Sequence, residues 1–360
     1  MKKVSIIGTV GVPASYGGFE ALVENLIRHH YLNNLPEEIT VYCSGKNYQE
    51  HRTHFLSARL CYIPLQANGI QSVLYDIVSL LIAIWRRQNA VLVLGVSGAI
   101  ALPLVRLFSK SILITNIDGI EWRREKWRGV AKHFLRFSEK IAVRYSHKVI
   151  ADNGAIASYI QNTYGIDSHV IAYGGDHAIH VDIAEVPSSI PSCGYAFAVC
   201  RIEPENNVHM VLEAFTNLPE HRLVFVGNWN RSDYGRSLRQ QYAEWSHIQM
   251  LDPIYDLGVL KSLRMHAGCY IHGHSAGGTN PSLVEAMHFG IPIFAFDCDF
   301  NRNSTDDEAI YFRNSEELMN AVCHLDDSVT KESGHRMKIL AKRYYTWEKI
   351  AQKYFDLIGE

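Results

Sequence analysis

Short runs of β-branched and other apolar residues recur along the chain, and each ends in glycine or a polar residue. In the first half they predict strands at residues 4–7, 39–42, 90–94, 112–116 and 149–151, with longer amphipathic stretches between them. The second half repeats the pattern, with strands at 195–200, 223–226, 269–272 and 291–296 and helices such as 207–215 and 282–289. This alternation predicts an α/β fold of two doubly wound, Rossmann-like parallel sheets, with binding crevices beyond the carboxyl ends of the strands.

The segment 171–191 separates the two halves. It contains Gly174-Gly175, Pro187 and Pro191 and few strand or helix formers, so we place the domain connection there. We expect domains at 1–175 and 176–345, with a substrate bound in a cleft between them. A terminal helix, 346–360, carries an aromatic stripe that needs burial: Trp347, Tyr354 and Phe355.

Composition fits a folded protein of two domains. The chain has 360 residues, 47% apolar and 20% charged, and a formal net charge of −2, which argues against a dedicated nucleic-acid binder. Residues 1–176 hold 19 Lys and Arg against 13 Asp and Glu, a net charge of +6, whereas the remainder holds 16 against 24, a net charge of −8. Nine of the basic residues lie between Glu121 and Lys148, which predicts one concentrated positive surface.

Cysteine spacing and the N-terminus favour a cytoplasmic protein. The seven cysteines include no Cys-x-x-Cys pair and suggest neither a disulfide framework nor a cysteine zinc site. The apolar run at 4–10 is short and lacks a cleavage site, so we interpret it as a first strand and not as a signal peptide. The stretch 90–108 is interrupted by Gly95, Pro103 and Arg106 and is better divided into a strand and a short helix than taken as a membrane span.

A glycine-rich loop follows the first predicted strand, at residues 8–20, and leads into a helix from about Ala21. Backbone N–H groups in such a loop can approach an anion, so Gly17 and Gly18 are candidates for binding the anionic part of a substrate, here called the donor. The loop lacks both the dinucleotide fingerprint and the P-loop lysine, and a tight turn explains it equally well.

A second, more specific loop follows the strand predicted at 269–272. Asn280 before Pro281 predicts a capped helix start that receives anions, and Glu285 lies about one turn inside that helix. A carboxylate beside a phosphate site can accept hydrogen bonds from sugar hydroxyls, so the pattern suggests a nucleotide-sugar. We count Gly277, Gly278, Thr279 and Asn280 as donor-binding. His272 and His274 could both face a metal, but no third ligand is evident, and we predict neither metal nor cofactor.

The segment 200–207 also joins a strand end to a helix start. Arg201 there can bind a phosphate group in a bidentate way. Asn206 and Asn228, each just beyond a predicted strand, complete the predicted donor site.

Together these segments resemble the retaining, GT-B-fold glycosyltransferases of family 4 over nearly the whole chain. The resemblance implies that the first domain's glycine loop touches the donor diphosphate, that Arg201 neutralises it, and that Glu285 is the second Glu of a Glu-x7-Glu motif. It also implies that the terminal helix crosses back to the N-terminal domain. Two positions depart from the family pattern, since Gly277 stands at the first Glu and Asn206 at a Lys.

Four segments are similar to a bacterial subgroup that contains β-1,4-rhamnosyltransferases of capsule and exopolysaccharide assembly: 15–20, 118–122, 201–206 and 278–282. The resemblance implies dTDP-L-rhamnose as donor, with UDP- and GDP-sugars as the other candidates, and a polyprenyl-diphosphate-linked saccharide as acceptor. It implies a retaining hexosyltransferase of cell-surface polysaccharide synthesis. Two other interpretations remain open: a nucleotide-sugar epimerase on the same fold, and a non-catalytic subunit of a polysaccharide assembly complex.

Asp118 follows the strand predicted at 112–116 and so lies at the crevice edge, where it could orient acceptor or donor or assist proton transfer. A turn or helix cap is the alternative. With Arg201 and Glu285 it makes up the predicted catalytic set. Arg201 and the helix start already supply positive potential to the diphosphate, so we expect turnover without a divalent metal.

The segment around 121–128 is predicted to face the acceptor and an anionic membrane. The helix after it has apolar residues at helical spacing, Val130, Phe134, Phe137, Ile141 and Tyr145, which we expect to dock on the sheet, leaving a basic row free from Arg128 to Lys148. Such a row suits the anionic inner face of the plasma membrane, so we expect a cytoplasmic, peripheral protein. The predicted acceptor-side or membrane-side residues are Tyr16, Glu121, Trp122, Arg123, Arg124, Lys126 and Arg128.

Overall fold

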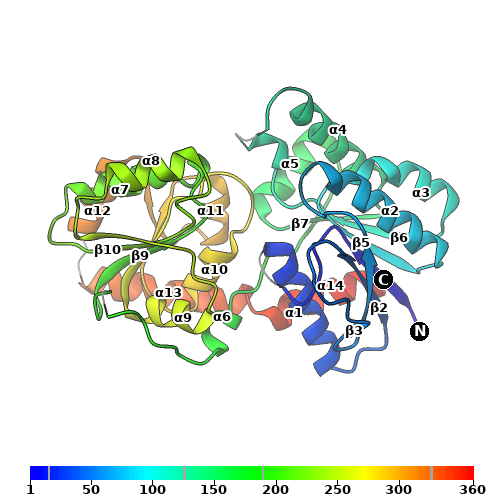
Figure 1. The fold of residues 1–360 in the computed structure, drawn as a ribbon, viewed down its shortest axis with the longest axis horizontal. Coiled ribbons are helices and arrows are strands. Elements are labelled where there is room, and N and C mark those ends of the chain that lie inside the picture. The colour runs from blue at the N-terminus through cyan, green and yellow to red at the C-terminus, as the bar shows by residue number, and fades with distance from the viewer. Residues whose placement is uncertain (15–16, 125–126, 189, 325–326) are drawn as a thin grey trace. The chain divides into compact units, whose positions relative to one another are not determined.

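The computed structural model describes residues 1–14, 17–124, 127–188, 190–324 and 327–360. The chain divides into two compact units, each built around its own sheet (Figure 1). Unit 1 comprises Met1–Ala172 together with Trp347–Glu360, and unit 2 comprises Tyr173–Thr346.

The sheet of unit 1 has eight strands in the order β3-β4-β2-β1-β5-β6-β7-β8. All neighbours pair in parallel except β3 and β4, which form an antiparallel pair. Central strands β1 and β5 are buried almost throughout, because helices cover both faces of a parallel sheet. The strands are β1 Lys3–Ile7, β2 Glu38–Ser44, β3 His54–Phe55, β4 Ala58–Ile63, β5 Ala90–Leu94, β6 Ile112–Asn116, β7 Lys148–Ala151 and β8 His169–Val170.

The helices of unit 1 cover the sheet in two groups. Strands β2 and β4 lie on one side of β1, whereas β5 to β8 follow one another on its other side. Right-handed crossovers therefore place α1 on one face of the sheet and the helices α2 to α5 on the other, as Figure 1 shows. The helices are α1 Gly18–Leu32, α2 Ser72–Trp85, α3 Leu102–Phe108, α4 Gly129–Tyr145, α5 Gly154–Tyr164 and α14 Trp347–Gly359.

The last helix, α14, belongs to unit 1 although it follows unit 2 in the sequence. Its aromatic stripe is buried as predicted: Trp347, Tyr354 and Phe355 are at most 7% exposed. The Tyr354 hydroxyl accepts a hydrogen bond of 2.7 Å from Nδ2 of Asn116, at the end of β6. The helix therefore supports the carboxyl edge of the sheet.

The buried face of α4 is only partly the one predicted, since Phe134, Ile141 and Tyr145 are half-buried. Val130 and Phe137 are exposed, and the helix instead buries Leu135, Ser138, Glu139, Ala142 and Val143. The reason is that the hydroxyls of Tyr159 and Tyr164 each donate a 2.7 Å hydrogen bond to Glu139, which satisfies a carboxylate inside the unit. Apolar spacing alone could not show that these tyrosines, on α5 and at its end, meet α4.

Unit 2 has a six-stranded, wholly parallel sheet in the order β11-β10-β9-β12-β13-β14. One side packs around Trp229, Phe215, Phe225, Phe294 and Phe312. The strands are β9 Tyr195–Val199, β10 Leu223–Val226, β11 Ile248–Leu251, β12 Ala267–His272, β13 Ile293–Phe296 and β14 Ile310–Phe312. The helices are α6 His177–His180, α7 Val208–Thr216, α8 Asp233–Gln241, α9 Leu257–His266, α10 Pro281–Met287, α11 Asp299–Ser304, α12 Ser315–Cys323 and α13 Asp327–Tyr344.

The predicted α/β architecture is confirmed, and a strand lies at each of the nine predicted places. The stretch 90–108 is a strand followed by the short helix α3. The strands β3, β4, β8, β11 and β14 were not predicted. Among the described residues, no helix is both long and apolar enough to span a bilayer.

Candidate donor site and the carboxyl edges of the two sheets

The helix start predicted at Asn280 is present. The Asn280 side chain caps α10 by accepting a 3.0 Å hydrogen bond from the Ser282 backbone N–H, and Pro281 is the first helical residue. Before it, Gly277 has a φ of 115°, a backbone conformation that favours glycine. Gly277, Gly278 and Thr279 are buried. The 273–280 loop thus runs from the end of β12 into a capped helix.

Two loops at neighbouring strand ends are joined through Asn206. Its Nδ2 donates a 2.7 Å hydrogen bond to the Arg201 carbonyl, and its Oδ1 lies 2.6 Å from Nδ1 of His274. Asn207 donates to the Gly273 carbonyl, and the Ser275 backbone N–H donates to the Glu205 carbonyl. The 200–207 turn after β9 and the 273–280 loop after β12 therefore form one connected edge.

Arg201 stands at this edge with its side chain 38% exposed, and Nε lies 3.9 Å from Oε2 of Glu203. That distance makes only a weak ion pair. Asn228, just after the adjacent strand β10, is exposed. The structure therefore brings Arg201, Asn206 and the 273–280 loop to one carboxyl edge, with Asn228 on the next strand.

Glu285 has two partners that sequence reasoning missed. Arg264 of α9 donates to Oε2, and Nε2 of His177 lies 3.3 Å from Oε1. Burial by itself raises the pKa of Glu285, but the charge of Arg264 and the hydrogen bond and charge of His177 outweigh it and hold that pKa below its ordinary value. No local spacing links positions 177, 264 and 285, because the fold alone brings them together.

His272, at the end of β12, is almost completely buried, and Nε2 has no hydrogen-bond partner among the described residues. Burial lowers its pKa to about 3, so the ring is neutral at pH 7. The neighbouring His274 ring is 5.9 Å away, with Nδ1 already engaged by Asn206. In the part of the chain that the structure describes, no three His, Cys, Asp or Glu side chains form a cluster suited to a metal ion.

One Asp-x-Asp spacing, Asp297 and Asp299, follows β13. Asp297 accepts hydrogen bonds from Arg302 at 2.5 Å and from Arg313 at 2.8 Å. The bond from Arg302 is the main reason that the pKa of Asp297 lies below its ordinary value. The charge of Asp297 is thus balanced by two arginines.

Two glutamate side chains of α1 accept hydrogen bonds from the glycine-rich loop of unit 1. Glu20 accepts hydrogen bonds from the Val10 backbone N–H at 2.7 Å and from the Thr9 hydroxyl at 3.1 Å, and Glu24 accepts one from the Ala14 backbone N–H at 2.7 Å. Gly17 has a φ of 132°, and a Cβ there would lie 1.9 Å from the Glu20 carboxylate. The N–H groups of Val10 and Ala14 are therefore already bonded within unit 1. Gly17 and Gly18 stand at the start of α1, and Tyr16 lies outside the described residues.

Asp118 follows β6 in a left-handed conformation, with φ of 60°. Its backbone N–H donates a 2.8 Å hydrogen bond to Oδ1 of Asn116, whose Nδ2 bonds Tyr354. A non-glycine residue held at positive φ is uncommon and concentrates at functional sites. Asp118 is thus fixed at the carboxyl edge of unit 1.

The segment after Asp118 is internally bonded. Glu121 accepts hydrogen bonds from Nε1 of Trp127 at 2.8 Å and pairs with Nε of Arg124 at 2.8 Å. The cationic groups of Arg123, Lys132 and Arg136 lie 5.1–5.8 Å from the Trp122 ring. Arg128 is exposed before α4, and Lys126 lies outside the described residues. The predicted membrane-side residues Trp122 and Arg124 are therefore committed to contacts within unit 1.

Two families match separate parts of the chain. Residues 1–176 match a domain of unknown function, DUF1972, and residues 193–323 match the family described as glycosyl transferases group 1. No curated protein sequence matches the chain.

Solved structures share the fold over the full length. A sucrose-phosphate synthase from Thermosynechococcus elongatus is 14% identical with a TM-score of 0.81, covering 99% of this chain and 98% of that one. The Anabaena protein HepE, solved with UDP and glucose, is 16% identical with a TM-score of 0.71, covering 100% and 99%. A protein from Listeria monocytogenes with the proposed assignment of UDP-N-acetylglucosamine 2-epimerase is 13% identical with a TM-score of 0.65, covering 98% and 94%. The chain has the GT-B fold, and the glycosyl transferases group 1 match supports glycosyl transfer from a nucleotide-sugar.

Proposed function

We propose that this chain is a retaining hexosyltransferase that moves L-rhamnose from dTDP-L-rhamnose to a polyprenyl-diphosphate-linked saccharide in cell-surface polysaccharide synthesis. The observation that carries the proposal is the connected edge of unit 2, where the exposed Arg201 stands beside the capped 273–280 loop within the region matched to glycosyl transferases group 1. The resemblance of segments 118–122, 201–206 and 278–282 to rhamnosyltransferases supports the donor and the acceptor.

The donor diphosphate binds at this edge in the proposal. Negative charge develops on the leaving diphosphate as the bond to the anomeric carbon breaks, and Arg201 lowers the barrier where that charge develops. Asn206 does not supply the second positive charge of the family pattern. It holds the Arg201 turn against His274, so its contribution is to fix the backbone from which the Arg201 side chain extends. Thr279, Asn280 and Asn228 complete the donor contacts.

Glu285 orients the donor sugar or ribose hydroxyls. A carboxylate has about four acceptor sites, and Arg264 and His177 use one on each oxygen. The two cations keep the carboxylate ionised and fix its rotamer. A hydroxyl pair can then bond to the remaining lone pairs.

Asp118 acts on the acceptor side. Its fixed backbone holds the carboxylate at the sheet edge, where it orients the attacking hydroxyl. In a retaining front-face reaction the acceptor oxygen forms a bond to the anomeric carbon while the bond from that carbon to the diphosphate oxygen breaks. The hydroxyl proton of the acceptor passes to the departing phosphate oxygen. Because the acceptor is lipid-linked, the enzyme works peripherally at the inner face of the plasma membrane.

A donor screen tests the proposal. The purified chain is incubated with dTDP-L-rhamnose, UDP-sugars and GDP-sugars, first alone and then with a polyprenyl-diphosphate-linked saccharide, while thermal shift and product formation are measured. We expect a rise in melting temperature with dTDP-L-rhamnose and transfer only when the acceptor is present. Isomerisation of a donor without acceptor would instead identify an epimerase. Donor binding without any turnover would identify a non-catalytic subunit.

A further inference from the structure

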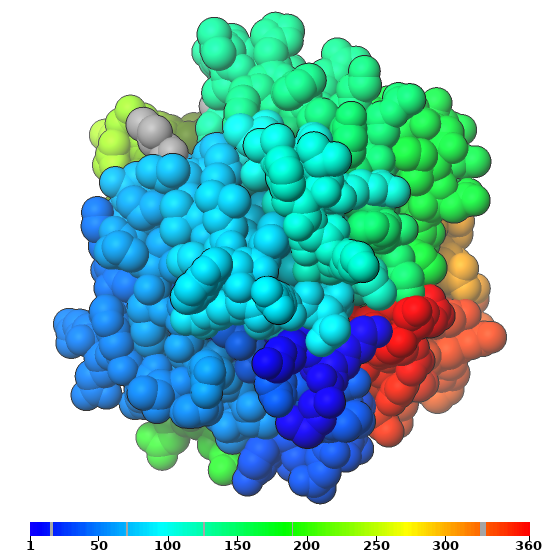
Figure 2. Space-filling model, turned by 90° about the vertical axis from the view of Figure 1, so that its right-hand side faces the viewer, coloured from blue at the N-terminus to red at the C-terminus, as the bar shows by residue number. Residues whose placement is uncertain are grey.

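One face of unit 1 exposes an unusual amount of apolar surface. Helices α2, α3 and α4 lie on the same face of the sheet, with α3 in contact with both others, and Figure 2 shows them in light blue, cyan and blue-green on adjoining parts of the surface. We call this surface the α2–α4 face. Its large exposed apolar side chains are Leu74, Leu81, Trp85, Leu104, Leu107, Phe108, Val130 and Phe137.

The exposed residues follow helical spacing. Leu74, Leu81 and Trp85 form one stripe on α2, and Leu104, Leu107 and Phe108 form one on α3. Trp85 is 82% and Phe108 77% exposed. Both helices also bury apolar residues toward the sheet, so each is apolar on two sides. A surface helix of a soluble protein ordinarily has polar residues on the side that faces water. A contiguous exposed apolar patch marks an interaction site.

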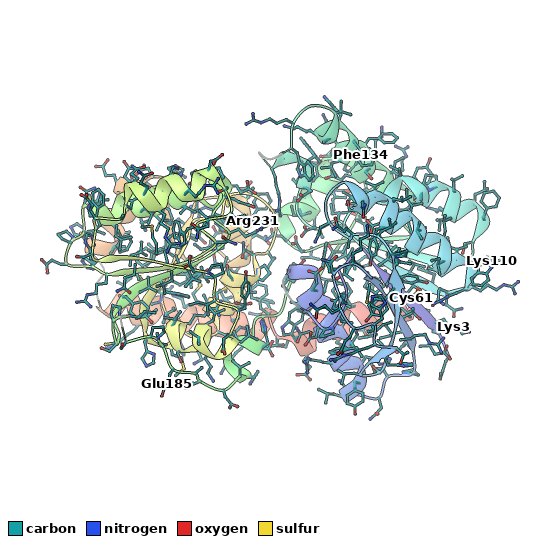
Figure 3. The ribbon with its side chains drawn as sticks, in the orientation of Figure 1. Lys3, Cys61, Lys110, Phe134, Glu185 and Arg231 are labelled. Carbon is teal, nitrogen blue, oxygen red and sulfur yellow. The ribbon has the colours of Figure 1, made fainter. Side chains whose placement is uncertain are left out.

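The charges of the α2–α4 face have a single sign. Its two acidic residues, Asp76 and Glu139, are both buried, so the described part of these helices and the residues directly after them expose no acid. Lys110, just after α3, extends from the outer edge of unit 1 (Figure 3). Lys132 and Arg136 are exposed but also lie over the Trp122 ring, and Arg106 donates to the Tyr145 carbonyl. The other exposed cations are Arg86, Arg87, Lys110, Lys140 and Arg144.

We propose that the α2–α4 face docks on an anionic lipid bilayer. The apolar stripes enter the interfacial zone, while the surrounding cations contact phosphate headgroups. Helix α2 has 14 residues and α3 has 7, too short to cross the hydrocarbon core, so they lie on the surface. A second copy of the chain is a poorer occupant, because a twofold contact would bring two positive surfaces together.

The proposal deepens the proposed function by naming the surface through which the enzyme reaches a lipid-linked acceptor. It extends the expectation drawn from the sequence, which placed the contact at 121–128 and on the basic row from Arg128 to Lys148, by adding the apolar stripes of α2 and α3. In that segment Arg124 and the Trp127 ring both bond to Glu121, and the Arg123 guanidinium lies 5.4 Å from the centre of the Trp122 ring. The α2–α4 face carries its apolar residues and most of its cations outward.

Co-sedimentation with vesicles tests the docking surface. The full chain is mixed with vesicles of equimolar phosphatidylglycerol and phosphatidylcholine, and separately with phosphatidylcholine alone. We expect binding to the anionic vesicles that weakens as salt rises, and at least tenfold weaker binding to the neutral ones. The triple variant Leu104→Ser, Leu107→Ser, Phe108→Ser and the triple variant Lys110→Glu, Lys140→Glu, Arg144→Glu should each lose at least tenfold in affinity for the anionic vesicles.

Matched controls change the same kinds of exposed residue elsewhere. They are Met265→Ser, Val329→Ser, Ile339→Ser for the apolar set and Arg231→Glu, Lys331→Glu, Lys353→Glu for the charged set, and both should bind as the parent does. Equal binding by parent and face variants, or no binding by the parent, overturns the proposal. A parent dimer that the apolar variant converts to a monomer, with vesicle binding unchanged, assigns the face to a second copy and also overturns it. The vesicle experiment contains neither sugar donor nor acceptor. If the chain proved unable to transfer a sugar, the vesicle-binding result would therefore still stand.

Discussion

At the scale of single residues, Arg201 is the side chain whose loss should affect the chemical step most directly. Its side chain is partly exposed, and in the proposed mechanism the charge that it pairs with grows as the diphosphate leaves. We expect Arg201→Ala to lower kcat by at least about tenfold with a smaller change in KM, and Arg201→Lys to recover part of the loss. Steady-state kinetics measure both, with Arg231→Ala, another exposed arginine of unit 2, as the control. An unchanged kcat in the folded variant would remove Arg201 from the site.

Glu285 has a structural role beside Arg264 and a proposed role in donor binding, which variants can separate. Glu285→Gln leaves the buried Arg264 without its counter-charge, so the free energy of unfolding should fall by about 3–5 kcal/mol. The double variant Arg264→Met, Glu285→Leu removes both charges and should regain much of that loss. Donor affinity, measured by calorimetry, should stay at least about tenfold weaker in both variants. Recovery of donor affinity in the double variant would show that Glu285 does not contact the donor.

His272 predicts a pH dependence of stability. Its pKa is about 3 in the folded chain against an ordinary value of 6.5, so the unfolded chain binds the proton first as the pH falls. Its contribution is fully present above pH 6.5 and is lost as the pH decreases toward 3. Urea unfolding of His272→Phe between pH 6.5 and 4.5 should therefore show a shallower pH slope, by up to about 1.4 kcal/mol per pH unit. The exposed His335→Phe is the control, and an identical slope in parent and His272→Phe would contradict the prediction.

At the scale of helices and strands, Glu139 shows how a buried charge sets the orientation of α4. Each tyrosine hydroxyl donates a charge-assisted hydrogen bond to it, typically worth about 1.5–3 kcal/mol. We expect Tyr164→Phe to reduce the free energy of unfolding by an amount in this range, measured by urea denaturation. Tyr31→Phe, on the exposed end of α1, should change it little. Equal stability of Tyr164→Phe and the parent would mean that this bond does not hold α4.

The same element marks the limit of what sequence could predict. Buried central strands such as 90–94 are continuous apolar runs, and Asn280-Pro281 is a local capping signal, so both could be identified without the fold. The outward stripe of α4 and the partners of Glu285 depend on residues far away in the sequence. The hydrogen bonds of Asn206 likewise need the 273–280 loop beside it. Local patterns give elements and caps, whereas long-range pairing decides which polar groups are buried.

At the scale of the whole molecule, positive charge for the diphosphate comes from side chains in the proposed mechanism. Arg201 stands at the donor edge, and Asp297 of the Asp-x-Asp spacing is balanced by Arg302 and Arg313. We expect turnover in excess EDTA to remain within about twofold of the untreated rate, because the preorganised donors need no added cation. A strict requirement for Mg²⁺ or Mn²⁺, restored by adding the metal back, would show that this account of diphosphate binding is wrong.

The position of α14 has a consequence for how the protein is made. The first 172 residues form all eight strands of unit 1, yet the helix that buries Trp347, Tyr354 and Phe355 in that unit is synthesised after the whole of unit 2. A nascent chain on the ribosome therefore exposes the α14 site of unit 1 while unit 2 emerges and folds. Translation that stops before Trp347 would leave a complete unit 2 attached to an unfinished unit 1, in which Asn116 lacks Tyr354 and the Asp118 turn loses its support. The helix α14 thus makes completion of unit 1 depend on synthesis of the residues that follow unit 2.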